Sequence, residues 1–247
     1  MIFSPLEQFE INILVPVSFV GFFDISLTNA TFYMLLAFGC FFYFILLGSW
    51  NLFLIPLKFQ SIIELIYQFI FDMIKDQASL KGQQFFPLFF LIFGFILFCN
   101  LLGLTPYAFT PTSHIILTFM IAFSFFIGLS IIGFLRQGVH FFQLFVPSGV
   151  PLAILPLMIG IEIMSYCIRP ISLSVRLFAN MLAGHTLLHI VAGFGVNLLK
   201  INFIFGLLPL LLLLAITALE FGIAFLQAYV FVILLSIYLK DSIKIAH

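Results

Sequence analysis

The polar residues that could do chemistry are concentrated in one apolar stretch, residues 162–189, with the sequence EIMSYCIRPISLSVRLFANMLAGHTLLH. A charge inside a hydrophobic span costs roughly 2.5–3.5 kcal/mol on insertion scales, and such residues usually mark ion or proton pathways. The stretch holds an acid, two permanent cations, an amide and two imidazoles, namely Glu162, Arg169, Arg176, Asn180, His185 and His189. These residue types favour the movement of a proton or another ion.

The spacing places most of these residues on one face of a helix. At about 100° per residue, the polar or small positions all fall within about 40° of Arg176. They are Glu162, Ser165, Arg169, Ser172, Arg176, Asn180 and Ala183. His185 and His189 form an i, i+4 pair on another side, so the helix has two different polar surfaces.

Arg176 cannot relay a proton by losing one, because arginine stays charged in proteins. It can instead fix a positive potential that draws a carboxylate into its charged form and repels a free proton. The alternative is a structural arginine paired with Glu162 or with a lipid headgroup. For Arg169, which is nearer to Glu162, a functional and a structural role both remain open.

Glu220 lies in a second apolar stretch, LLPLLLLLAITALEFGIAF, where desolvation disfavours its charged form. It can therefore take up and release protons near neutrality, unless it is only a buried acid that supports helix packing. His185 titrates near neutrality and is a natural neighbour for this acid, while His189 is expected to be a packed or supporting group. Asn180 and Gln227 can position water or the arginine without changing charge.

Composition identifies an integral membrane protein. Of the 247 residues, 64% are hydrophobic and 7% are charged, against about 25% charged in soluble domains. Acids and bases balance at nine each, so no basic surface favours nucleic acid as a partner. The first 29 residues show no signal or transit peptide, which predicts insertion through the chain's own spans or synthesis inside the compartment where it works.

Hydropathy predicts the elements that position the site. The expected fold is all-α, with five membrane-crossing helices and one amphipathic surface helix in a single membrane domain, residues 1–247. Residues 1–29 are expected to be an irregular lead-in. The expected helices span residues 30–48, 59–77 (the surface helix), 85–103, 114–135, 150–192 and 201–240. The last two are too long for an upright crossing of a bilayer of about 30 Å, so each folds back or is steeply tilted, and the lack of turn-forming clusters favours tilt.

The positive-inside rule supports five crossings. Most lysines and arginines outside the polar helix fall on one side, while Lys200 falls on the other. The N-terminus is therefore expected outside, and the surface helix and the C-terminus inside. Asp241, at the inner end of the last span, is either a solvated terminus or a member of an ion path.

Together these blocks resemble subunit a of F-type ATP synthases. The likeness lies in PISLSVRLFANMLAGH, preceded by Glu162, and extends over nearly the whole chain through SPLEQFE, NLLGLTPYAFTPTSH, VPSGVPLAILPLMIGIE and LEFGIAFLQAYVFVILLSIYLKD. SPLEQFE, His185 and Glu220 are similar to the mitochondrial branch. Bacterial and plastid members more often carry an acid at the position matching His185.

The resemblance implies a stator subunit that packs against a rotating ring of c subunits, whose carboxylates carry the transported proton. It implies Arg176 as the essential arginine, an outer half-channel with His185 and Glu220, and an inner one with Glu162 and Asp241. Asn180 and Gln227 match polar residues that flank the arginine. It further implies the peripheral stalk, other stator membrane subunits and lipids as partners, with no cofactor, metal or nucleotide bound by this chain. The implied location is the mitochondrial inner membrane, with an organelle-encoded chain, the N-terminus in the intermembrane space and the C-terminus in the matrix.

Two other classes of function remain open from the residues. A haem- or quinone-binding respiratory subunit would need axial histidine pairs on facing helices, and only His185 and His189 lie within a span. A purely structural assembly subunit would leave Arg176 without a role. In an antiparallel hairpin with a turn near residues 193–202, placing His185 level with Glu220 also brings Glu162 level with Asp241 and Arg176 beside Gln227.

Overall fold

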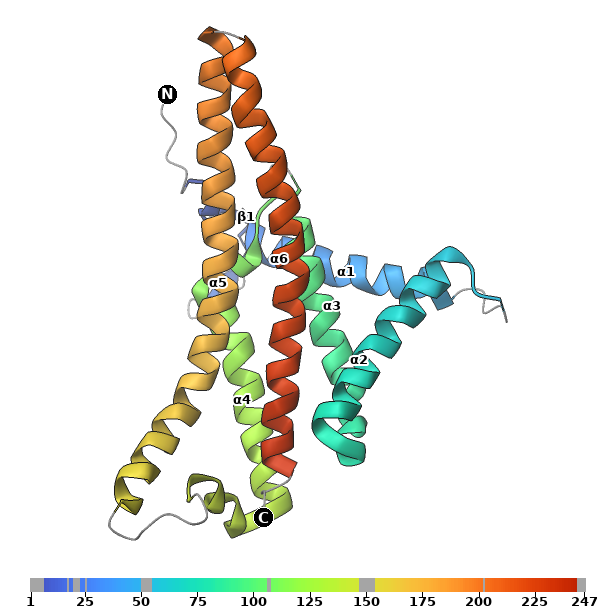
Figure 1. The fold of residues 1–247 in the computed structure, drawn as a ribbon, viewed down its shortest axis with the longest axis vertical. Coiled ribbons are helices and arrows are strands. Elements are labelled where there is room, and N and C mark those ends of the chain that lie inside the picture. Colours follow the sequence, from blue (N-terminus) through green and yellow to red (C-terminus); the bar gives the residue numbers. More distant parts are fainter. Residues whose placement is uncertain are drawn as a thin grey trace. The chain divides into compact units, whose positions relative to one another are not determined.

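The computed structural model describes residues 7–16, 18–19, 23–24, 26–49, 55–105, 108–146, 154–201 and 203–243, and its long elements are helices (Figure 1). Within these ranges, five helices are long and apolar enough to cross a membrane. They are Asn29–Ser49, Gln83–Gly103, Ile115–Gln137, Leu155–Ile201 and Gly206–Ile243. The predicted all-α membrane fold with five candidate spans is confirmed.

Helices α1, α3, α4 and α6 begin and end within three residues of the predicted positions, while α2 and α5 end later than predicted. Their bounds are α1 Asn29–Ser49, α2 Lys58–Gly82, α3 Phe86–Gly103, α4 Ile115–Gln137, α5 Leu155–Ile201 and α6 Phe203–Ile243. Three short 3-10 segments lie between them, η2 Gln83–Phe85, η3 Pro111–Ser113 and η4 Gly138–Phe145. The amphipathic helix α2 continues past the predicted residue 77, and residues 150–153 of the predicted fifth span lie outside the described residues.

The turn predicted near residues 193–202 is shorter than expected. Helix α5 continues to Ile201 and α6 begins at Phe203, so the predicted end of α5 at residue 192 is wrong. Gly193 and Gly195 do not stop α5, since a glycine costs only about 1 kcal/mol in a helix and the surrounding residues are apolar. Both long helices also continue through an internal proline, Pro170 in α5 and Pro209 in α6.

The chain divides into two compact units that interleave along the sequence. The first unit comprises Met1–Leu46, Gly94–His114 and Leu177–Ala228, and the second comprises Leu47–Phe93, Ile115–Arg176 and Tyr229–His247. Helices α5 and α6 each contribute one part to each unit.

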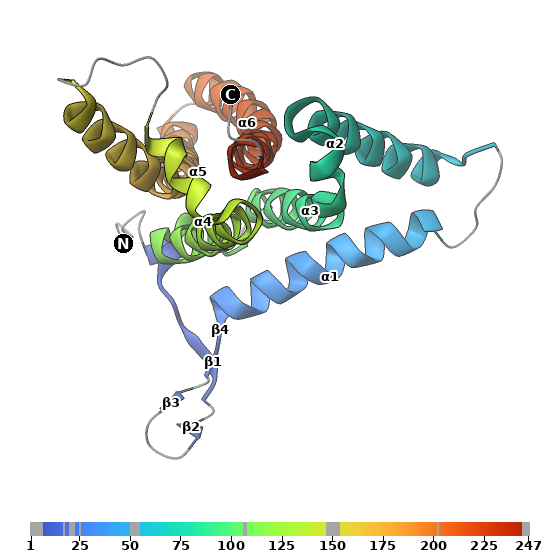
Figure 2. The same ribbon diagram turned by 90° about the horizontal axis from the view of Figure 1, so that it is seen from below.

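In the first unit, the N-terminal segment is more regular than the irregular lead-in predicted from sequence. It contains η1 Glu7–Phe9 and four short strands, β1 Ile13–Val15, β2 Ser18–Phe19, β3 Phe23–Asp24 and β4 Leu27–Thr28. Strand β1 pairs antiparallel with β4, and β2 pairs with β3. Figure 2 shows β1 and β4 at the start of α1. The prediction failed because strands this short have no measurable hydrophobic alternation.

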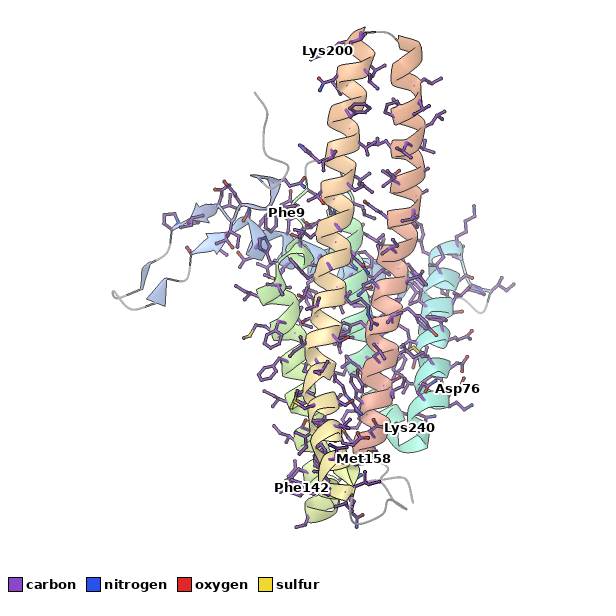
Figure 3. All side chains as sticks on the ribbon, turned by 60° about the vertical axis from the view of Figure 1, so that its left-hand side comes forward. Phe9, Asp76, Phe142, Met158, Lys200 and Lys240 are labelled. Atoms are coloured by element: carbon purple, nitrogen blue, oxygen red, sulfur yellow. The ribbon has the colours of Figure 1, made fainter. Side chains whose placement is uncertain are left out.

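The rest of the first unit packs the end of α3 and the following loop against α6. Asn100 of α3 is fully buried, donates to the carbonyl of Ala224 on α6 at 3.4 Å and accepts a 3.0 Å hydrogen bond from the Thr112 hydroxyl. The parts of α5 and α6 in this unit run side by side, and Lys200 lies at their connecting end (Figure 3). Gly195 of α5 approaches Pro209 of α6, so the predicted antiparallel hairpin is confirmed here.

In the second unit, α2 packs only part of its predicted apolar face. Ile70, Met73 and Ile74 are buried, whereas Ile62 near the start of the helix is 48% exposed. Tyr67 contacts the Phe86 ring of α3 at 4.5 Å between centroids. At the end of α4, Gln137 donates a 2.9 Å hydrogen bond to the carbonyl of Ser242 on α6.

Candidate functional site

The first unit contains a cavity between α5 and α6 that is lined by three polar side chains of the predicted outer path, Asn180, His185 and Glu220. Its volume is about 330 Å³, enough for several water molecules at about 30 Å³ each. The lining is otherwise apolar and comprises Leu104, Asn180, Met181, Ala183, Gly184, His185, Leu187, Ile216, Leu219, Glu220 and Ile223. His185 and Glu220, which the sequence predicts to be neighbours, both line this cavity.

Glu220 is a buried acid with no hydrogen-bond partner for either carboxyl oxygen among the described residues. Buried polar atoms nearly always have a partner, and exceptions call for an explanation such as water or a catalytic role. A carboxyl group at the wall of a cavity can exchange a proton with water that enters it. The alternative role of Glu220 is a buried acid that supports helix packing through a hydrogen bond. The described part of the chain contains no such bond to its carboxyl oxygens.

Gly184 allows the Glu220 carboxyl group to reach this position. A β-carbon at residue 184 would lie 2.8 Å from Oε1 and 3.0 Å from the carboxyl carbon of Glu220. Only glycine permits such a close approach without displacing the acid. The contact also sets the local register, because residue 184 of α5 faces residue 220 of α6.

His185 is the second side chain of the cavity with an unpaired polar atom among the described residues. Its Nε2 is buried and has no hydrogen-bond partner in the described part of the chain. The ring of Phe9, on η1, meets the imidazole edge to face with 6.5 Å between ring centroids. His189, one turn further along α5, is exposed and does not line the described cavity wall.

Asn180 and Gln227 form a polar bridge between α5 and α6 in the first unit. The Asn180 amide donates a 2.9 Å hydrogen bond to Oε1 of Gln227. Gln227 is buried, and its Nε2 has no partner among the described residues. The bridge therefore leaves one amide donor available at a fixed position on α6.

In the second unit, Arg169 of α5 forms a 3.0 Å ion pair with Asp241 of α6. The guanidinium also lies over two aromatic rings, 5.4 Å from the centroid of Tyr166 and 4.9 Å from that of Tyr238. The Tyr166 hydroxyl is 2.6 Å from that of Ser130 on α4. The residue that meets Asp241 is thus Arg169, two turns of α5 beyond Glu162, and a pairing of Glu162 with Asp241 remains a prediction.

Arg176 and Glu162 also belong to the second unit. Arg176 is exposed on α5, and no described acid of this unit forms an ion pair with it. Its predicted structural pairing with Glu162 is therefore not present. Glu162 is half-buried, whereas the apolar residues on either side of it in the chain, Ile161 and Ile163, are exposed.

Two contacts of the site have no counterpart in the sequence predictions. The contact of Gly184 with Glu220 had a possible signal in the sequence, because a glycine inside a helix often marks a close approach of another group. The contact of Phe9 with His185 has no signal in the periodicity of the sequence, since it joins residues far apart in the chain.

Among the described residues, no three His, Cys, Asp or Glu side chains are grouped so that they could hold a metal ion.

The five candidate spans and the polar groups set within them define a multi-pass membrane protein with an ionisable site between helices. The chain belongs to the family described as ATP synthase A chain, whose profile matches residues 31–240. It is 49% identical to ATP synthase subunit a of Acanthamoeba castellanii, with 100% of both chains covered. It is 48% identical to that of Pelagibacter ubique over 99% of both chains, and 47% identical to that of Brassica napus over 98% of this chain and 96% of the relative.

Membership in this family assigns the role of a proton-translocating stator subunit in the membrane sector of an F-type ATP synthase. The chain works in the membrane with the c-ring and other subunits of that sector. The haem- or quinone-binding alternative and the purely structural alternative receive no support from these relatives.

Proposed function

We propose that protons cross this subunit through two half-channels that do not join, and that Arg176 separates them. The outer half-channel uses His185 and Glu220, with Asn180 and Gln227 at its inner limit. The inner half-channel uses Glu162 and Asp241. A proton can pass from one to the other only on a carboxylate of the rotating c-ring, so its flux is coupled to rotation and to ATP synthesis.

The observation that carries the proposal is the pair of unpaired titratable groups in one cavity. Both carboxyl oxygens of Glu220 and Nε2 of His185 are buried without a partner in the described residues, and both side chains line the same space. An acid and an imidazole that line one cavity can exchange a proton through water in it.

The exposure of Arg176 supports its proposed place at the rotor. A permanent cation on an apolar helix needs a counter-charge, and its own unit supplies none among the described acids. The c-ring carboxylate is a fitting partner, because an opposite charge nearby favours the charged form of an acid. An arriving protonated carboxyl group would then release its proton into the inner half-channel before it passes Arg176.

We place the subunit in the mitochondrial inner membrane, with the N-terminus in the intermembrane space and the C-terminus in the matrix. The motif SPLEQFE, His185 and Glu220 favour the mitochondrial branch and an organelle-encoded chain. The contact of Phe9 with His185 supports this orientation, since it joins the N-terminal segment to the outer half-channel. Peripheral-stalk subunits, other stator membrane subunits and lipids are the expected neighbours.

Substitution of Glu220 tests the proposal. Proton flux is measured through membranes that hold the assembled complex, with Glu220→Gln, Glu220→Asp and the control Thr217→Val. We expect Glu220→Gln to slow flux about tenfold or more, because the amide cannot release a proton, and Glu220→Asp to slow it less. Thr217 is exposed one turn away and its hydroxyl donates to the carbonyl of Leu214 in its own helix, so Thr217→Val should resemble the wild type. Equal, undiminished flux in both Glu220 variants would show that Glu220 is a packing residue.

A further inference from the structure

Among the described residues, the N-terminal segment meets the proposed outer half-channel through an aromatic contact. Phe9 meets the His185 imidazole edge to face, with an interplanar angle of 78° and 6.5 Å between ring centroids. We propose that Phe9 is a positioning residue that holds the His185 ring in the orientation that serves proton transfer with Glu220. This inference rests on the role proposed above for His185.

Phe9 is held in place by hydrogen bonds directly after it in the chain. Asn29, the first residue of α1, donates through its side chain to the Glu10 carbonyl at 3.0 Å. Its Oδ1 accepts from the backbone N–H of Asn12 at 3.3 Å, and its own N–H donates to the Asn12 carbonyl at 3.1 Å. Strand β1 then pairs with β4, which leads into α1. The segment that carries Phe9 is therefore tied to the start of a membrane helix at several points.

His185 needs such support because no polar group orients the buried end of its ring. Nε2 has no hydrogen-bond partner among the described residues. A histidine in a proton path normally gains its orientation from a hydrogen bond at one ring nitrogen. In this chain an aromatic ring can supply the constraint, since edge-to-face packing has a preferred geometry and a ring on one side excludes other imidazole rotamers.

The orientation matters because proton transfer depends on distance. Glu220 lies across the cavity, at a position set by Gly184, the neighbour of His185. A general acid and base exchange a proton only within hydrogen-bond reach or through one water. If the imidazole turns away from the cavity, the water link to Glu220 lengthens and transfer slows. Through Phe9, the N-terminal segment then influences the rate of proton transfer in the outer half-channel.

The test compares two substitutions that separate ring geometry from apolar volume. Phe9→Leu keeps an apolar side chain without a ring, while Phe9→Tyr keeps the ring. Phe38→Leu is the matched control, because Phe38 is a half-exposed phenylalanine of α1 in the same unit. Proton flux is measured through membranes that hold the full complex and is normalised to the amount of assembled complex. We expect Phe9→Leu to slow flux about two- to tenfold, Phe9→Tyr to keep most of it, and Phe38→Leu to match the wild type.

A double-mutant cycle with His185→Gln identifies the residue through which Phe9 acts. If Phe9 works through His185, Phe9→Leu adds little in the His185→Gln background, because coupled residues are not additive. Losses that multiply, or a Phe9→Leu variant with wild-type flux, would overturn the positioning role. A His185→Gln variant with undiminished flux would instead contradict the proposed function, so the two failures are distinguishable.

Discussion

Asn180 on α5 and Gln227 on α6 are joined by a 2.9 Å hydrogen bond in which the asparagine amide donates to the glutamine Oε1. The bond crosses between the two long helices at the end of the proposed outer half-channel. Since Gln227 is buried and Asn180 is exposed, the bridge has one end in the protein core and one at the surface of its unit. It therefore fixes the position of the Gln227 side-chain NH2 group, which has no partner among the described residues.

Removing either partner should break the same bridge. We expect Asn180→Leu and Gln227→Leu each to slow proton flux, with a cost to stability of about 1 kcal/mol, as for one intramolecular hydrogen bond. The double variant should lose little more than the worse single one. Thr186→Val is the control, because the Thr186 hydroxyl is exposed and bonds within its own helix to Ala183. Flux measurements and melting of the complex check this, and additive losses would show that the two residues act separately.

The ion pair of Arg169 with Asp241 predicts a charge-swap rescue in the second unit. We expect Asp241→Asn to destabilise the subunit by about 1–3 kcal/mol, less than the loss of a fully buried pair, because both side chains are partly exposed. Asp76→Asn, at an exposed acid of α2, should have little effect. Arg169→Asp combined with Asp241→Arg should recover part of the lost stability in a melting experiment.

The result of that swap also decides what Asp241 does. If the double variant recovers stability but not proton flux, Asp241 has a role in the inner half-channel beyond the ion pair. If it recovers both, the pair is structural. A double variant as unstable as Asp241→Asn would contradict a direct pairing of the two residues.

Arg176→Lys should abolish coupled ATP synthesis while leaving assembly largely intact. Lysine can lose its proton when it is desolvated, and it lacks the planar fork of arginine. The measurement is the ATP synthesis rate per assembled complex, with complex yield as the control for folding. Normal synthesis rates in this variant would be incompatible with an essential arginine at this position.

The proposed orientation predicts which side of the membrane each segment faces. Tags at the C-terminus and near Lys75 should be reached from the same side, the matrix, and a tag at the N-terminus from the intermembrane space. For Lys75, the measurement is labelling by a membrane-impermeant amine reagent that is applied to one side of sealed membranes. Labelling of Lys75 from the N-terminal side would contradict five crossings.

Much of the fold was predictable because membrane helices are set by length and hydropathy, which are local properties of the chain. In the first unit, the assumed placement of His185 level with Glu220 agrees with the contact of Gly184 with Glu220. In the second unit, the same register placed Glu162 level with Asp241, whereas the structure pairs Asp241 with Arg169. The end of α5 was not predictable in this way, because glycines in an apolar helix signal a turn and a tolerated residue equally well.

The contacts of individual side chains were less accessible to sequence reasoning. The partner of Asp241 is Arg169, a contact made possible by the reach of an arginine side chain and by two flanking tyrosine rings. Phe9 and His185 meet through tertiary packing alone. Such pairs depend on how helices and strands come together, and no periodicity along the chain encodes them.

The most direct test of two separate half-channels is proton flux measured while rotation is blocked. Membranes that hold the assembled complex are given a potential, which supplies about 2.3 kcal/mol per charge per 100 mV, and the c-ring is cross-linked covalently to the stator. We expect flux to fall to the level of protein-free membranes and to return when the cross-link is cleaved. In Arg176→Ala, a leak should persist with the ring locked, because the positive barrier is gone. Undiminished flux through the locked wild-type complex would contradict the proposal, since it would require a continuous path from Glu220 to Asp241.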